Sequence, residues 1–330
     1  MTQAAMQDRP QCWPDLPLES WKDTCATLHM WTQIVGKVRL RLTPLVNHWW
    51  NVPLYVDTRG LTTRRLHYQG TTFEIAFDFV DHVLIVRTAD GRARSFELRS
   101  GESVAEFDRR LHAALAELDI DVEIKEEPFG LPMTTPFPRD LEHASWDRDA
   151  IERFARILDW SDSVFEKFSG WFNGKTSPVH LFWHGLDLAV TRFSGRRGAA
   201  LEADLVTQEA DSHEVISFGF WAGDDTVGDA AYYSYTAPEP ERLRDEPLSC
   251  GEWIEYGSGS LALLPYESVQ SARDPQTTLL AFCQSAYEAG ARLAGWDTSG
   301  FESRWCPTPA QLKEFHATAI AEFGRPVVSS

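Results

Sequence analysis

One stretch of the sequence, residues 177–198, constrains the fold more than any other. It reads SPVHLFWHGLDLAVTRFSGRRG and holds too many β-branched and aromatic residues, with too few turn residues, to form a surface loop. Pro178 stands where a strand can begin, and Gly185 could bulge or bend it. Both alternating faces of residues 179–193 are largely apolar, so we predict one long central strand covered on both sides.

Two histidines of this stretch, His180 and His184, have the spacing of a helical metal site. On a strand that rises roughly 3.3 Å per residue, however, they stand about 13 Å apart. One ion cannot bridge that distance. We therefore predict no metal bound by both histidines. The alternative for each is a buried imidazole that is hydrogen-bonded to backbone or to a carboxylate.

The charge balance argues against two classes of partner. A formal net charge of −18 opposes nonspecific attraction to nucleic acid and to anionic membranes. The sequence has no run of about 18 apolar residues, and its first residues, MTQAAMQDRPQ, lack the pattern of a signal peptide. Five scattered cysteines without a Cys-x-x-Cys pair indicate reduced thiols. We expect a soluble, cytoplasmic protein that binds neither nucleic acid nor membrane; the oligomeric state stays open.

Acidic residues are concentrated in residues 199–260, where fourteen aspartates and glutamates accompany two arginines. Such an excess is typical of a solvated surface. It could also be the docking surface of a noncatalytic interaction or scaffold protein. This second function is the alternative to ligand binding.

Periodicity predicts the elements of the first half. Apolar residues recur at helical spacing over residues 20–36 and predict a first helix. Residues 38–42, 73–79 and 82–88 alternate instead, which predicts antiparallel strands with a hairpin turn at Asp90-Gly91.

A capping box opens the helix that closes this half. Ser103 and Glu106 have its spacing, and an apolar stripe follows, so we predict a helix over about residues 103–119. Four prolines then lie in EEPFGLPMTTPFPR, a composition that suits an extended linker. We place a first unit at residues 1–127, a linker at 128–146 and a second unit at 147–330.

The second unit has the same kinds of element. Apolar spacing after residue 150 indicates a helix with a possible break at 161–163. The predicted strands are 179–193, 213–221, 231–236, 250–256 and 260–264. Asp274-Pro275 is the start of a helix, and Thr308-Pro309 opens a last one in the same way.

The order of elements suggests a duplication. Each half reads helix, strands, helix, and each has a histidine, His48 or His180, that opens an aromatic segment ending in Thr-Arg. We predict an α+β fold of two related helix–antiparallel sheet–helix units in tandem, packed together.

No standard catalytic signature is present: we find no Gly-x-Ser-x-Gly, Walker loop, Gly-x-Gly-x-x-Gly or His-Glu-x-x-His. The sequence therefore assigns no cofactor and no reaction. The candidate catalytic residues are His180, His184, Asp187, His213 and Glu214. Adjacent residues of a strand point to opposite faces, so at most one of the last two enters a given pocket.

Arginines follow both aromatic segments although the chain is strongly acidic. Guanidinium groups bind carboxylate and phosphate, which suggests a small anionic ligand in an aromatic pocket. The candidate binding residues are His48, Trp50, Arg59, Trp183, Arg192, Arg196, Tyr233 and Tyr235. The alternative is that these arginines pair with internal carboxylates such as Asp187.

Several motifs also indicate a family. The opening WPDLPLESWKDTCATLHMWTQIVGKVRL, then HLFWHGLDLAVTRFSGRR, SHEVISFGFWAGD, YYSYTAPEPE and LLPYESV, resemble a bacterial family known as domain of unknown function number 5996. The resemblance covers nearly the whole chain. It implies no activity, substrate or catalytic residue.

Overall fold

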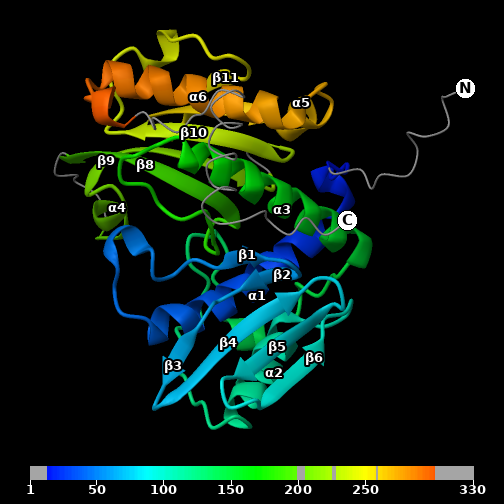
Figure 1. The fold of residues 1–330 in the computed structure, drawn as a ribbon. Coiled ribbons are helices and arrows are strands. Elements are labelled where there is room, and N and C mark those ends of the chain that lie inside the picture. Colours follow the sequence, from blue (N-terminus) through cyan, green and yellow to red (C-terminus); the bar gives the residue numbers. More distant parts are fainter. Residues whose placement is uncertain (1–12, 199–204, 225–227, 258, 302–330) are drawn as a thin grey trace, which may run out of the picture.

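The computed structural model describes residues 13–198, 205–224, 228–257 and 259–301. It contains two antiparallel sheets of six strands each, with helices packed on them (Figure 1). This confirms the predicted α+β class with two similar units. No helix in these ranges is long and apolar enough to cross a bilayer. The predicted helix at Thr308-Pro309 lies outside the described residues.

The first half contains η1 (Leu18–Ser20), α1 (Lys22–Leu42), η2 (Asn47–Trp49), β1 (Tyr55–Asp57), β2 (Gly60–Thr62), β3 (Leu66–Tyr68), β4 (Thr71–Asp78), β5 (Val83–Thr88), β6 (Ala93–Glu97) and α2 (Val104–Ala116). Its sheet has the order β1-β2-β4-β5-β6, and β3 pairs with β4. The strand predicted at 38–42 is wrong, because α1 continues through these residues until Thr43, just before Pro44. The predicted cap of α2 is confirmed: Ser103 accepts a hydrogen bond from the Glu106 backbone N–H.

The second half contains η3 (Phe137–Arg139), α3 (Arg148–Gly170), β7 (His180–Phe182), β8 (Asp187–Arg197), α4 (Leu205–Ala210), β9 (His213–Trp221), β10 (Ala231–Ala237), η4 (Leu243–Asp245), β11 (Glu252–Tyr256), β12 (Gly259–Pro265), α5 (Tyr266–Gln270), α6 (Pro275–Leu293) and η5 (Thr298–Gly300). Its sheet has the order β11-β12-β10-β9-β8-β7. α3 is continuous through residues 161–163. Asp274 caps α6, as predicted, by accepting from the Thr277 backbone N–H.

Residues 179–193 form a hairpin and not the predicted single strand. β7 turns at residues 183–186 and returns as β8, with His180 opposite Ala189. The turn contains Leu186 at a positive φ of 50°. The separation of about 13 Å along one strand therefore does not describe His180 and His184, because the second histidine lies in the turn. The β-rich composition of the stretch concealed a turn that contains a single glycine.

Helices cover one face of each sheet, and the halves share a core. Phe168 of α3 packs on Phe218 of β9, with ring centroids 4.8 Å apart. In the first half, Trp31 of α1 stacks on Phe107 of α2 at 4.8 Å. Leu54 and Leu181 exchange backbone hydrogen bonds of 2.9 and 2.8 Å between the halves. This junction brings segments of the first half to the second sheet. The predicted domain limits and the duplication itself stay predictions.

Candidate functional site

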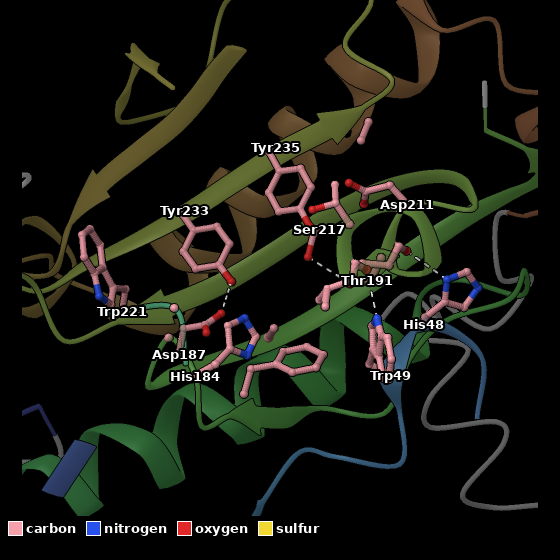
Figure 2. Close-up of a pocket in the computed structure, with 18 of the residues that line it drawn as sticks. His48, Trp49, His184, Asp187, Thr191, Asp211, Ser217, Trp221, Tyr233 and Tyr235 are labelled. Atoms are coloured by element: carbon pink, nitrogen blue, oxygen red, sulfur yellow. Dashed lines mark hydrogen bonds between the residues drawn. The ribbon is translucent and has the colours of Figure 1, made fainter. Parts of the chain in front are cut away.

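A cavity of about 1640 Å³ lies on the face of the second sheet that α3 and α6 leave uncovered. Side chains alternate along β8, β9 and β10, so Arg192 and Phe218 point to the helices. Thr191, Ser217 and Tyr233 point the other way, into the cavity (Figure 2). Further walls come from α1, η2 and α4. The cavity thus lies between the second sheet and segments that reach it from elsewhere in the chain.

Asp187 and Tyr233 are joined at one end of the cavity, although their strands β8 and β10 do not pair. The Tyr233 hydroxyl donates to Oδ2 of Asp187 at 2.5 Å. The Tyr233 ring crosses β9 at its own partner Gly219, where a Cβ would collide with the ring. Gly219 is therefore required for this contact. The ring of His184, from the hairpin turn, lies beside the Asp187 carboxylate (Figure 2).

The middle of the cavity is a band of hydroxyl groups and rings. Thr191 Oγ1 and Ser217 Oγ lie 2.9 Å apart and share a hydrogen bond. The rings of Tyr233 and Tyr235 are nearly parallel, with centroids 6.5 Å apart and planes at 14°. Residues two apart on β10 share a face, which explains this arrangement. The band offers both flat apolar surface and hydrogen-bonding groups.

The far end is formed by η2 against α4. His48 Nδ1 donates to a carbonyl oxygen of α4 at 3.0 Å, and Nε2 is then the atom that accepts from Lys175 Nζ at 2.7 Å. Trp49 Nε1 donates to another α4 carbonyl at 2.9 Å. Asp211 follows α4 and also lines the cavity (Figure 2). The α4 backbone thus fixes both rings at this end of the cavity.

Burial shifts the ionisation of the groups around the cavity. It raises the pKa of both Asp187 and Asp211. It lowers the pKa of His48 and His184, and that of His180 to about 3. The three imidazoles are therefore neutral at pH 7. His180 Nδ1 is buried without a hydrogen-bond partner within the described ranges.

The structure brings most of the predicted site residues together. Those that line the cavity are His48, Trp50, His180, Trp183, His184, Asp187, Tyr233 and Tyr235. Trp183 Nε1 donates to Val52 O at 3.0 Å, and its indole lies against Gly36 of α1, where a Cβ would collide with it. His213 and Glu214 do not line the cavity. Glu214 instead pairs with Arg196 at 2.7 Å.

The predicted arginines do not frame the cavity. Arg59 pairs with two aspartates of the first half, and Arg196 pairs with Glu214. Strand alternation turns Arg192 toward α3, where its guanidinium carbon lies 3.5 Å from the centroid of the Phe168 ring. None of the three arginines lines the cavity. Their positions give no support to an anionic ligand held by these residues.

Sequence reasoning missed further cavity residues: Trp49, Thr191, Asp211, Ser217 and Trp221. Ser217 and Trp221 alternate with the buried Phe218 and Phe220 on a correctly predicted strand. The alternation of Ser217 and Trp221 with two phenylalanines, which gives one strand face a polar group, was the signal that could have identified these two residues. Trp49 lies in the three-residue helix η2 and Asp211 in a turn, and segments this short carry no periodic signal.

Metal ligation and thiol chemistry have little support at this site. Within the described ranges, no group of three or more His, Cys, Asp or Glu side chains is arranged to hold a metal ion. Cys25 lines the cavity as a free thiol. Burial raises the pKa of this thiol to about 12, so it is not a ready thiolate nucleophile.

Comparison with known proteins gives one match. The model of a family described as "Family of unknown function (DUF5996)" matches residues 13–303. The match includes every element around the cavity. No curated protein and no solved structure matches the chain.

Proposed function

We propose a function for this chain, which belongs to the family of unknown function DUF5996: it binds a small organic molecule in the cavity on its second sheet. The observation that carries the proposal is a cavity of about 1640 Å³ with aromatic walls and several inward polar groups. Ligand sites in proteins typically occupy about 300–1,000 Å³ and combine these same features. The cavity is therefore large enough for an organic molecule together with bound water.

The polar groups of the cavity support binding over a purely structural role. A core residue is buried, but Asp187, Thr191, Tyr233 and Tyr235 keep part of their surface accessible in the cavity. They are also fixed in place, since Thr191 bonds Ser217 and Tyr233 bonds Asp187. Preorganised polar groups on a rigid sheet are what a specific ligand site requires.

The alternative of a noncatalytic scaffold with an acidic surface at residues 199–260 has weaker support. A solid core in place of the cavity would have favoured it. Several acidic groups of this region are engaged within the chain, as in Arg244–Glu255 at 2.7 Å and Arg242–Asp245 at 2.8 Å. We place the protein in the bacterial cytoplasm, a proposal to which the free thiols of the described cysteines lend support.

The proposal is tested by filling the cavity. Thr191→Trp places an indole in it, and Ser95→Trp makes the same change on the exposed face of β6. A chemically diverse library is screened by thermal shift, and native mass spectrometry searches for a retained molecule. We expect compounds that stabilise the parent and Ser95→Trp but not Thr191→Trp.

A second cavity variant, Tyr235→Leu, guards against loss of folding in the first, and circular dichroism verifies both folds. Compounds that stabilise parent and both cavity variants equally bind elsewhere. That result, or a library that leaves the parent unmoved, would favour the scaffold alternative.

A further inference from the structure

We propose that the ligand is an organic cation, whose ammonium group lies over the Tyr233 and Tyr235 rings between the carboxylates of Asp187 and Asp211. This inference rests on the proposed function and names the chemical class of its ligand. It differs from the anionic ligand suggested by the sequence. The reason is that the predicted arginines do not line the cavity, whereas the carboxylates of Asp187 and Asp211 do.

The two carboxylates come from opposite ends of the cavity, but both interact electrostatically with the Tyr235 hydroxyl. Asp187 begins β8, and Asp211 follows α4. Both raise the pKa of the Tyr235 hydroxyl, in addition to its burial, so both lie within electrostatic reach of this group. A cation near Tyr235 would therefore interact with both carboxylates.

Within the described part of the chain, no lysine or arginine neutralises either carboxylate. The charged group that acts on Asp187 is His184, whose own pKa is lowered by burial, and its hydrogen-bond donor is the neutral Tyr233. Burial alone shifts the pKa of Asp211. A ligand ammonium group would compensate the desolvation of both carboxylates.

The surrounding rings suit a cation as well. The parallel faces of Tyr233 and Tyr235, 6.5 Å apart, carry negative potential toward the cavity, and Trp221 stands near Asp187 (Figure 2). Aromatic faces combined with a carboxylate are a common way to recognise an ammonium group.

Of the lysines and arginines that line the cavity, Lys37 is buried and the others are exposed. Arg41, Lys125 and Arg242 are exposed, and Arg242 pairs with Asp245 at 2.8 Å. Lys37 lies over the Trp183 ring, 6.0 Å from its centroid. We therefore expect these basic groups to contribute little to binding over the two tyrosines.

The test uses compounds that differ only in their head group. Phenylethylamine, phenylethanol and phenylacetate form one series, and butylamine, butanol and butyrate form a second. Binding to the full chain is measured by isothermal titration calorimetry and by thermal shift at pH 7.5. We expect an amine to bind at least about tenfold more tightly than its alcohol, and the carboxylate to bind no better than the alcohol.

Variants locate the charge effect. Asp187→Asn removes the negative charge but keeps an oxygen that can accept the hydrogen bond from Tyr233. Asp211→Asn removes the negative charge of the carboxylate that follows α4. Asp149→Asn is the matched control on the exposed start of α3. We expect the first two to remove most of the amine preference over the alcohol, and the control to keep it.

The outcomes separate this inference from the proposed function. If the alcohol or carboxylate binds as well as the amine and Thr191→Trp abolishes that binding, the cavity is a ligand site but the cation class is wrong. If the amine still binds more tightly than the alcohol in both Thr191→Trp and Tyr235→Leu, the cation binds at another place. If neither series binds at all, the inference fails, and the library screen then decides the fate of the proposed function.

Discussion

The hydroxyl of Tyr233 donates a hydrogen bond of 2.5 Å to Asp187, two strands away, by crossing the glycine between them. This contact joins β8 to β10 without any backbone pairing between them. It also holds a half-buried carboxylate at one end of the cavity, beside His184 (Figure 2). The proposed ligand site therefore depends on a residue, Gly219, that has no side chain of its own.

Gly219→Ala tests this dependence. The added methyl group would collide with the Tyr233 ring, so we expect the free energy of unfolding to fall by about 1–3 kcal/mol through overpacking. Urea denaturation measures it. Gly170→Ala is the control at the end of α3, where a Cβ meets nothing within 4 Å. An equal effect of both substitutions would show that Gly219 has no special role.

Tyr233→Phe removes the donor and leaves the ring. The hydrogen bond from Tyr233 lowers the pKa of Asp187 against the larger raising effect of burial. We therefore expect the variant to raise that pKa further, as followed by carbon-13 NMR titration of the carboxyl group. The free energy of unfolding at pH 7 should fall by about 0.5–1.5 kcal/mol, because one hydrogen bond to a half-buried carboxylate is lost. An unchanged Asp187 titration would contradict the contact.

Arg192→Met separates a structural arginine from a ligand-binding one. The guanidinium lies among the Phe168, Phe172 and Tyr287 rings, and burial lowers the pKa of this side chain to about 10. Methionine of similar length should leave the free energy of unfolding unchanged or raise it by about 1–4 kcal/mol. Arg192→Ala, which leaves a void, should lower it by about 2–5 kcal/mol.

The thermal shift caused by a ligand provides a second measurement on the Arg192 variants. Since Arg192 points away from the cavity, Arg192→Met should keep any thermal shift that a ligand produces in the parent. Loss of that shift in a folded Arg192→Met variant would mean that Arg192 contributes to ligand binding.

His180→Gln probes pH dependence. Burial depresses the pKa of His180 from 6.5 to about 3. The imidazole thus contributes stability that is present above pH 6.5 and lost as the pH falls toward 3, because the unfolded chain binds a proton that the folded chain does not. The stability difference between parent and variant should change by about 1.4 kcal/mol for each pH unit below 6.5. Urea denaturation at pH 7 and 4.5 measures this; a parallel decline of both proteins would mean that His180 is not buried as a neutral group.

Local sequence determined much of the fold. Capping at Ser103 and Asp274, the hairpin at Gly91 and the strands β9 and β10 all follow from signals within a few residues, and the structure has each of them. The α+β class follows from the same periodicities, because caps, turns and apolar spacing act over short distances along the chain.

Tertiary structure decided the rest, and above all the site. In the turn at residues 183–186 the Asp187 carboxylate lies close to Gly185, and Trp183 packs against Gly36 of α1 from the other half. The contacts of each arginine depend on the face of the strand it occupies and on the residues packed there. Arg192 therefore contacts aromatic rings and does not line the cavity. Such choices depend on desolvation and on hydrogen bonds between residues far apart in sequence, such as Trp183 with Val52 or Tyr233 with Asp187. A linear pattern identifies these residues as polar or aromatic, but the packing of the two halves decides which of them meet.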